Sequence, residues 1–216
     1  MVVGPVHIIG TGLLGASIGF RARQLCAEVQ LEDVSPAAVA LARDLGAGDV
    51  WHPGDPEPAL VIVATPPDVA GQVAVAALER YPHALVTDVA SVKTRVVRDV
   101  VGHPESHRYI GSHPMAGRER SGAIAADADL FAGRPWVITR VPGNSDDTVT
   151  TVQQFALDMG AMPILMAPEE HDRSVALVSH LPQLMSSLVA GALRKAPLES
   201  LGLAGQGLRD VTRIAH

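Results

Sequence analysis

Residues 6–15 read VHIIGTGLLG and decide the fold of this chain. The apolar run at residues 6–9 is typical of a buried strand, and a helical pattern at residues 16–26 follows the glycines. Between them, Gly10, Gly12 and Gly15 have the spacing G-x-G-x-x-G. In this context the first glycine permits a tight turn, the second lets a pyrophosphate approach the backbone, and the third lets helix and strand pack closely. The stretch predicts a dinucleotide-binding turn with the phosphates at the helix N-terminus.

Asp33 stands at the end of the second predicted strand, residues 29–33. In a dinucleotide site, an acidic residue about 20 positions after the glycines holds the ribose hydroxyls, and its charge repels a 2′-phosphate. We therefore expect NAD as the cofactor, with NADP disfavoured. The alternative for Asp33 is a turn or capping role, because Ser35-Pro36 is typical of a helix N-cap and first helical residue.

The rest of the first 167 residues alternates short apolar runs with helical patterns. Strands separated by helices predict a Rossmann-type α/β fold with a doubly wound, mostly parallel sheet. Residues 169–194 have no strand pattern and predict one long helix with a kink at Pro182. We expect a dinucleotide-binding domain at 1–167 and a short all-helical domain at 168–216. The further strands are expected at 60–64, 84–87, 108–111, 134–139 and 162–166, and the further helices at 36–45, from about 68 to 79, and at 146–159.

The composition of the 216 residues excludes several classes of function. A net charge of −6 without a basic patch argues against nucleic-acid binding. The single cysteine, Cys26, rules out an intramolecular disulfide and fits a cytoplasmic location. The N-terminus lacks the basic segment of a signal peptide, and the longest apolar runs are too short to span a membrane. No cluster of histidine, cysteine and carboxylate residues has a metal-binding spacing, so no metal is expected.

His113 lies in the segment GSHPMAG, residues 111–117, directly after the fifth predicted strand. That position is the carboxyl edge of the sheet, where open α/β sheets bind ligands. A histidine beside a nicotinamide can accept a proton while a hydride leaves a carbinol carbon. The alternative is a histidine whose ring is satisfied by hydrogen bonds within its loop.

Six stretches in order along the chain resemble the successive motifs of the prephenate/arogenate dehydrogenases of tyrosine biosynthesis. The glycine turn is generic, whereas the histidine and TRIA stretches are specific to the family. The stretches are GTGLLGAS (10–17), TDVASVK (87–93), SHPMAG (112–117), PEEHD (168–172), SHLP (179–182) and GLRDVTRIA (207–215).

This resemblance implies an NAD-dependent oxidative decarboxylation of prephenate to 4-hydroxyphenylpyruvate, or of arogenate to tyrosine. Hydride leaves C4 of the cyclohexadienol, CO2 departs and the ring becomes aromatic. The resemblance makes His113 the acceptor of the C4 hydroxyl proton and Ser91 its support beside the nicotinamide. It makes Arg213 the ligand of a substrate carboxylate, for which a guanidinium is suited.

The complete set of site residues expected on these grounds has three parts. The catalytic residues are His113 and Ser91. The substrate-binding residues are Arg213, His180, Ser112 and Thr212. The cofactor-binding residues are Gly10, Thr11, Gly12, Leu13, Leu14, Gly15, Asp33, Ala64, Thr65, Pro66 and Ser91.

For several residues the sequence also allows an alternative role or sets an expectation about exposure. Lys93 could steady a phosphate or a loop carboxylate, or it could lie on the surface at a helix start. His171 is expected at a solvated helix start. His180 could bond a neighbouring carbonyl, and Arg213 could pair on the surface with Asp210 one turn earlier.

The chain departs from the family pattern at two places. Many members continue SHLP with a second histidine, where this chain has Gln183. Members also continue into further helices that complete a homodimer, so residues 168–216 are expected to be a truncated form of that helical domain.

Three rival functions stay open at this level. One is a 4-amino-4-deoxyprephenate dehydrogenase of secondary metabolism, which would keep His113 and Arg213. Another is a generic β-hydroxyacid dehydrogenase, which would need a catalytic lysine that residues 169–194 do not contain. The third is a non-catalytic dinucleotide-binding regulatory protein, against which the joint presence of His113, Ser91 and Arg213 argues.

Overall fold

The computed structural model describes residues 4–194 and 196–215. The chain divides into two compact units, Met1–His171 and Asp172–His216.

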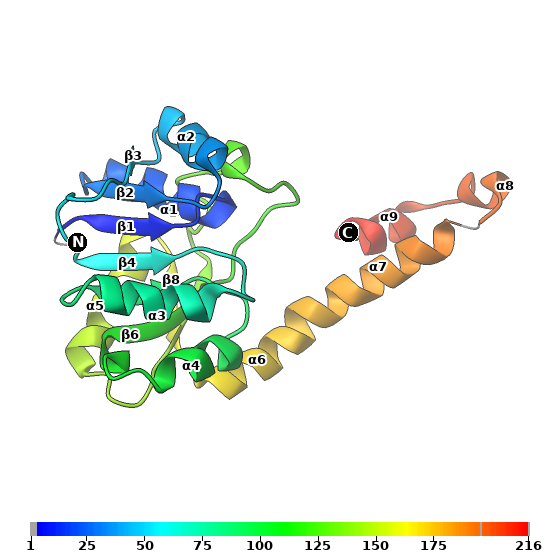
Figure 1. Cartoon of the computed structure of the whole chain (residues 1–216). Helices are drawn as coiled ribbons and strands as arrows, with labels where there is room; N and C mark the ends of the chain where they lie inside the picture. Colours follow the sequence, from blue (N-terminus) through cyan, green and yellow to red (C-terminus); the bar gives the residue numbers. More distant parts are fainter. Residues whose placement is uncertain (1–3, 195, 216) are drawn as a thin grey trace. The chain divides into compact units, whose positions relative to one another are not determined.

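The first unit is built on an eight-stranded sheet with the order β3-β2-β1-β4-β5-β6-β7-β8 (Figure 1). All neighbouring strands are parallel except β6 and β7, which are antiparallel. The chain reaches β7 through residues 115–134, which contain only a short 3-10 turn and no crossover helix. The strands are β1 (Val6–Ile9), β2 (Val29–Glu32), β3 (Asp49–Val50), β4 (Leu60–Val63), β5 (Leu85–Asp88), β6 (Tyr109–Pro114), β7 (Pro135–Thr139) and β8 (Met162–Leu165).

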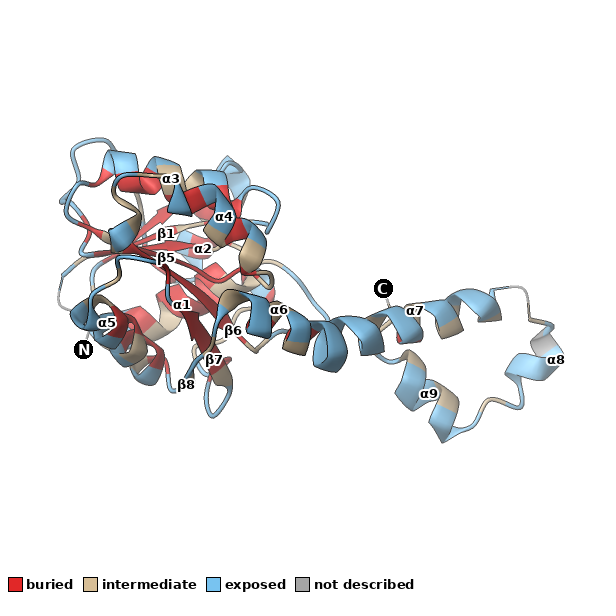
Figure 2. Ribbon diagram, turned by 90° about the horizontal axis from the view of Figure 1, so that it is seen from below, coloured by how far each residue is buried: buried red, intermediate tan, exposed pale blue. Residues whose placement is uncertain are grey.

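Helices cover both faces of this sheet, so a separate apolar core lies on each face (Figure 2). One core joins the sheet to α1, α2 and α5, and the other joins it to α3 and α4. The mostly parallel, doubly wound arrangement confirms the predicted fold class. These helices are α1 (Leu13–Gln24), α2 (Pro36–Asp44), α3 (Ala70–Arg80), α4 (Thr94–Val101) and α5 (Asp146–Asp158).

Most predicted elements of this unit are present, with four differences in detail. Helix α4 was not predicted, and β6 extends to Pro114 beyond the predicted 108–111. The first helix begins at Leu13, three residues earlier than predicted, because the helix starts inside the glycine turn. The two-residue strand β3 was not predicted, since Asp49–Val50 is too short to show a period. The predicted start of α2 is confirmed: the Ser35 hydroxyl accepts from the amide of Ala38 at 3.3 Å, and Pro36 follows it.

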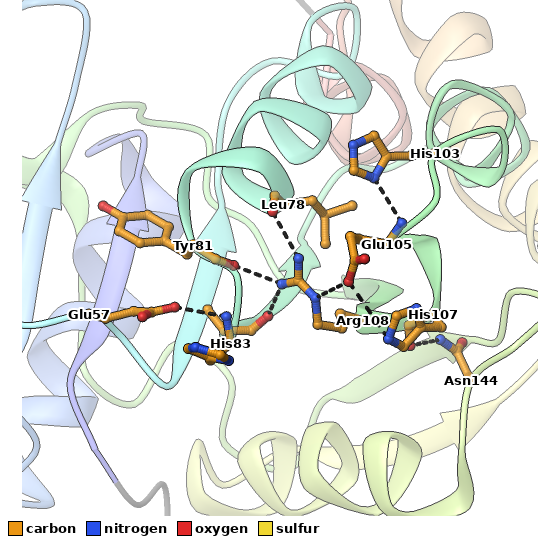
Figure 3. Close-up of polar contacts among 10 residues, drawn as sticks. Glu57, Leu78, Tyr81, His83, His103, Glu105, His107, Arg108 and Asn144 are labelled. Atoms are coloured by element: carbon orange, nitrogen blue, oxygen red, sulfur yellow. Dashed lines mark hydrogen bonds and ion pairs between the residues drawn. The ribbon is translucent and has the colours of Figure 1, made fainter.

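Arg108, the residue immediately before β6, forms hydrogen bonds at the amino edge of the sheet (Figure 3). Its guanidinium donates to the carbonyls of Leu78, Tyr81 and Ala84 at 2.7–2.8 Å, and its Nε donates to Glu105 at 3.0 Å. The last carbonyls of a helix have no partner within the helix. Arg108 therefore satisfies the C-terminal end of α3 and the loop that leads into β5.

The second unit is helical. It contains the end of α6 (Pro168–Val175), α7 (Leu181–Leu193), α8 (Leu198–Leu201) and α9 (Gln206–Thr212). A π-helical turn, Ala176–His180, lies just before Pro182, the residue at which a kink was predicted. Proline has no amide hydrogen and clashes with the carbonyl four residues earlier, so the regular hydrogen-bond ladder cannot pass through it. The side-chain amide of Gln183 donates to the carbonyl of Ile214 and ties α7 to the end of α9.

The helical stretch Pro168–Leu193 is long and apolar enough to cross a membrane by length and composition. The sequence reasoning considered only uninterrupted apolar runs and so did not consider this helix. Four charged residues stand in its first turns, and small and polar residues separate the leucines that follow.

Candidate active site

A cavity of about 1130 Å³ opens at the carboxyl edge of the sheet in the first unit. This is the edge at which α/β sheets of this kind bind ligands, and the volume is at the upper end for small-molecule sites. Among the residues predicted from the sequence, the cavity is lined by Gly10, Gly12, Leu13, Leu14, Asp33, Ala64, Thr65, Pro66, Ser91 and His113.

The three glycines occupy the positions that the fingerprint requires. Gly10 has a φ of +102°, and a Cβ there would meet the carbonyl oxygen of Ala64 at 2.5 Å. A Cβ at Gly15 would meet the carbonyl oxygen of Gly10 at 1.9 Å, so α1 packs directly on the turn. A Cβ at Gly12 would meet nothing within 4 Å, so the space above this residue is open. The turn thus leaves room for a ligand at the one glycine where a phosphate would approach.

Asp33 joins the glycine turn to the end of β2. Its Oδ2 accepts from the amide and the hydroxyl of Thr11, at 2.7 and 2.9 Å, and its Oδ1 accepts from the amide of Ser35 at 2.9 Å. Asp33 also lines the cavity. The turn role considered as an alternative is therefore present, and it fixes the carboxylate at the wall of the cavity.

Thr65 gives the cavity an unsatisfied polar atom. Its Oγ1 is buried and has no hydrogen-bond partner among the described residues. Buried hydroxyls are normally hydrogen-bonded, so this one is suited to a bound polar group. Thr11 and Gly15 differ from the other predicted cofactor residues, because both are buried under the turn and support it without lining the cavity.

His113 and Ser91 line the cavity together. His113 is 8% exposed, and its Nδ1 lies 2.9 Å from Nε2 of His171. The ring contact at Nδ1 of His113 is therefore with His171, whereas the resemblance had suggested support from Ser91. The prediction of a solvated His171 is wrong: the side chain is fully buried, and its ring contacts His113 near the end of β6.

Beneath His113 lies a buried polar network that the sequence did not reveal. The ammonium of Lys93 contacts Asp88 Oδ1 and donates to the carbonyl of Ser112 at 2.5 Å. The other Asp88 oxygen accepts from the hydroxyl of Tyr109 at 2.6 Å. Burial, and then the adjacent Asp88 carboxylate, raise the pKa of Tyr109 well above its usual value, so this phenol stays a donor. Residues from β5, α4 and β6 are thus joined directly below the site.

Two predictions are corrected by this network. Lys93 is fully buried, so the surface alternative is wrong, and the carboxylate that it holds is Asp88. Ser112 was expected to bind substrate, but its side chain is also fully buried and does not line the cavity. Its hydroxyl donates to the carbonyl of Asp88 at 2.7 Å and accepts from Thr87 at 3.2 Å. Alternation along β6 directs Ser112 away from the cavity, toward which its neighbour His113 is directed.

The far end of the cavity has a charge cluster that sequence reasoning missed. Glu32 and Arg80 line the cavity and form an ion pair at 2.5 Å, and Glu32 lies 3.2 Å from His7. The nearby ring of His7, followed by Arg80, lowers the pKa of Glu32 from 4.5 to about 2, although burial opposes this shift. Arg80 also lies 5.0 Å above the ring of Trp51. No local pattern marks this cluster, because its members come from four separate segments.

The other predicted substrate residues belong to the helical unit. His180 ends the π-helical turn and is exposed. The hydroxyl of Thr212 donates to the carbonyl of Leu208 at 2.8 Å, within α9. Arg213 follows α9 and is exposed, and Asp210 accepts from Gln206 at 2.8 Å. Within residues 4–194 and 196–215, no group of three or more metal-ligating side chains could hold a metal ion.

The fold and the cavity define a Rossmann-type dinucleotide-binding protein with a helical second unit. Residues 18–165 match the family model described as the nucleotide-binding domain of prephenate dehydrogenase, and residues 167–216 match the model of its dimerization domain. The chain belongs to the prephenate dehydrogenase family, which confirms the resemblance. The first match begins after the glycine turn, so the turn is identified by its geometry.

Similar proteins include a probable prephenate dehydrogenase of Streptomyces niveus, 35% identical over 96% of this chain and 57% of the relative. The cyclohexadienyl dehydrogenase of Zymomonas mobilis is 30% identical over 97% of this chain and 75% of the relative. The solved prephenate dehydrogenase of Aquifex aeolicus, in complex with hydroxyphenyl propionate and NAD+, superposes with a TM-score of 0.88 at 28% identity. That match covers 99% of this chain and 78% of the solved chain.

Proposed function

We propose that this chain carries out the NAD-dependent oxidative decarboxylation of prephenate or arogenate. The observation that carries the proposal is the position of His113 on the same cavity as the glycine turn and Asp33. The open space at Gly12 and the orphaned hydroxyl of Thr65 fit a bound dinucleotide. The solved relative from Aquifex aeolicus, with NAD+ and a substrate analogue, supports the same assignment.

In this proposal the residues of the first unit have separate tasks. The N-terminus of α1 binds the pyrophosphate through its backbone amides, and Asp33 holds the ribose hydroxyls. NAD+ bound in this way supplies the acceptor for the hydride that leaves C4 of the substrate. His113 takes the proton of the C4 hydroxyl, and Ser91 borders the reacting end of the cavity. The bond to the ring carboxylate breaks as CO2 leaves, and its electron pair enters the ring and moves onto the C4 oxygen. That oxygen takes the proton back from His113, so the product is a phenol, and aromatisation provides the driving force.

The helical unit would supply recognition of the substrate. Arg213, His180 and Thr212 stand in the motifs from which their roles were inferred, and an arginine binds a carboxylate through two parallel hydrogen bonds. We assign residues 1–167 to the cofactor and 168–216 to substrate binding and dimerisation. For Arg213→Ala we expect KM for the substrate to rise about 10–100-fold, the value of a lost charged hydrogen bond, with a smaller change in kcat. A normal KM in steady-state assays would remove Arg213 from this role.

The direct test is NADH formation by the full chain with prephenate, arogenate and 4-amino-4-deoxyprephenate in parallel. Turnover of prephenate or arogenate supports the proposal, and the ratio of kcat/KM values identifies the preferred side chain. The highest kcat/KM with the amino compound would move the function to the rival substrate. No turnover with any of the three by a protein that binds NAD would contradict the enzyme proposal.

The cofactor preference has its own test. Asp33 would repel the 2′-phosphate of NADP, so we expect NAD to bind at least about tenfold more tightly. Replacing Asp33 by serine removes the charge and is expected to reduce the difference between the affinities for NAD and NADP. Equal affinities of the unchanged protein for NAD and NADP would exclude the proposed role of Asp33.

We further propose that the partner of the helical unit is a second copy of the chain, in the cytoplasm. Exposed apolar side chains follow α7 at a helical spacing, and the family model for residues 167–216 describes a dimerization domain. Such a stripe normally packs against another helix. These side chains are Leu181, Leu184, Met185 and Leu188, which are 47–58% exposed.

Sedimentation of the full chain tests this proposal. We expect a dimer that Leu184→Glu converts to a monomer. The control is Leu157→Glu, at a leucine of α5 that is 52% exposed, and it is expected to leave the dimer intact. A monomeric unchanged protein, or recovery of the chain in the membrane fraction of cells, would contradict a soluble dimer.

A further inference from the structure

The side chain that contacts His113 is another histidine on a different element. His171 lies in the first turns of α6 and is fully buried, and its Nε2 is 2.9 Å from Nδ1 of His113. The two rings are close to perpendicular, with centroids 5.1 Å apart and an interplanar angle of 77°. Both residues belong to the first unit. In this geometry the N–H of one of these two nitrogens can donate a hydrogen bond to the lone pair of the other nitrogen.

A hydrogen bond between two imidazoles needs one protonated and one unprotonated nitrogen. If His113 is the proton acceptor of the proposed reaction, its ring is neutral before the reaction and one nitrogen must offer a lone pair. Since Nδ1 is directed at His171, the accepting nitrogen is Nε2, and the proton of the neutral ring is then on Nδ1. This arrangement requires Nε2 of His171 to be an acceptor, which makes His171 neutral with its own proton on Nδ1.

We propose that His171 is a positioning residue that fixes the tautomer and the ring orientation of His113, an inference that rests on the proposed function. In hydrolases with a serine nucleophile, a buried aspartate performs this task for the catalytic histidine, and the wrong tautomer costs a large part of the rate. Here the acceptor is an uncharged imidazole. When His113 has taken the substrate proton, its Nδ1–H becomes a charge-assisted donor to His171, so the contact strengthens during the reaction.

Two substitutions separate this role from simple packing. In His171→Gln the amide oxygen can replace Nε2 as the acceptor, whereas His171→Leu fills a similar volume without an acceptor. We expect kcat to fall about 10–100-fold in His171→Leu, as for the loss of a supporting hydrogen bond at an active site, and to stay within about threefold in His171→Gln. KM and the Kd for NAD are expected to be unchanged in both. His107→Leu, at an exposed histidine on the amino edge, is the control and is expected to leave kcat unchanged.

Nitrogen-15 NMR of the imidazoles provides a readout that needs no turnover. At a pH where the ring is neutral, we expect His113 to carry its proton on Nδ1 in the unchanged protein. In His171→Leu the resonances are expected to move toward a mixture of the two tautomers, and in His171→Gln to keep the original pattern. If His171→Leu does not fold, the tautomer of His113 in the unchanged protein and in His171→Gln still tests whether His171 fixes it.

The possible outcomes separate the two proposals. A neutral His113 that carries its proton on Nε2 in the unchanged protein would overturn the inference. Equal kcat values for His171→Leu and His171→Gln would overturn it as well. The expected tautomer in a protein that turns over no substrate would contradict the proposed function and leave the role of His171 in fixing the ring intact.

Discussion

The polar groups described at the two edges of the sheet differ in whether they have hydrogen-bond partners within the protein. At the amino edge, Arg108 donates to three backbone carbonyls and to Glu105, so the polar groups find partners within the protein (Figure 3). At the carboxyl edge, the hydroxyl of Thr65 has no partner among the described residues, and the space above Gly12 is open. The first edge stabilises the fold, whereas the second holds polar groups in place for a ligand.

The layer below the carboxyl edge explains how unsatisfied groups can be held there. The Lys93 ammonium, the Asp88 carboxylate and the Tyr109 hydroxyl are all buried and bonded to one another. A buried ion pair of this kind is costly to break, because removal of one partner leaves the other charge uncompensated. The network is therefore suited to keep the loop of Ser91 and the end of β6 at His113 rigid.

The largest effect is expected at His113. His113→Asn removes the proposed base, so we expect kcat to fall about 10²–10⁴-fold, the usual range for general base catalysis. The affinity for NAD is expected to change little, because the asparagine is smaller and the glycine turn is untouched. Steady-state assays combined with NAD titration measure both quantities. An unchanged kcat would exclude His113 from the chemistry.

At the amino edge we expect the opposite of the His113 result: a substitution that lowers stability and leaves kcat unchanged. Arg108→Met leaves the carbonyls of Leu78, Tyr81 and Ala84 without their donor, so we expect the free energy of unfolding to fall by about 2–4 kcal/mol. Below the unfolding temperature, kcat is expected to be normal. Urea denaturation measures the first quantity. Arg43→Met, which breaks an exposed ion pair with Asp44, is the control and is expected to cost about 0–1 kcal/mol.

A stable Arg108→Met protein with reduced kcat would contradict the division of tasks between the two edges. So would an Arg108→Met protein that loses no more stability than the Arg43→Met control.

A smaller effect is expected at Glu32, at the far end of the cavity. The pKa of this carboxyl is lowered from 4.5 to about 2 by His7 and then by Arg80. A carboxyl with a depressed pKa in the folded state contributes stability above its unfolded pKa and loses that contribution as the pH falls through the folded value. The stability advantage of the unchanged protein over Glu32→Gln is thus expected to shrink between pH 4.5 and about 2. A pH-independent difference in urea denaturation would contradict this ionic role.

Local patterns were sufficient for the parts of the fold and site that depend on neighbours in sequence. The spacing of Gly10, Gly12 and Gly15 predicted the turn, because the need for a residue without a side chain at these positions is set by the local backbone and by the ligand space. The Ser35-Pro36 pair predicted the start of α2 for the same reason. His113 was expected just after a strand, at the edge that the carboxyl ends of parallel strands share. The edge was predicted correctly, but the strand continues to Pro114, so His113 lies within β6.

The rest depends on contacts between segments that are distant in sequence. His171 was assigned to solvent because two glutamates precede it, yet it reaches His113 across 58 positions. Lys93 was ambiguous because a lysine at a helix start is normally exposed. Asp88 is only five positions away, but the fold brings Ser112, 19 positions away, to the same ammonium and buries it. Long-range ion pairs and buried polar contacts have no period, so the sequence of one chain does not display them.

The central claim is that the carboxyl-edge cavity is a dinucleotide site, and calorimetric titration of NAD into the unchanged protein and Gly12→Ala tests it most directly. A methyl group at Gly12 meets nothing in the protein, so the substitution is expected to lower the free energy of unfolding by no more than about 1 kcal/mol, the cost of alanine at the N-cap of α1. It would occupy the space of the pyrophosphate, so we predict a Kd for NAD that is at least about tenfold weaker. The same Kd for both proteins, or no binding of NAD to the unchanged protein, would contradict the account.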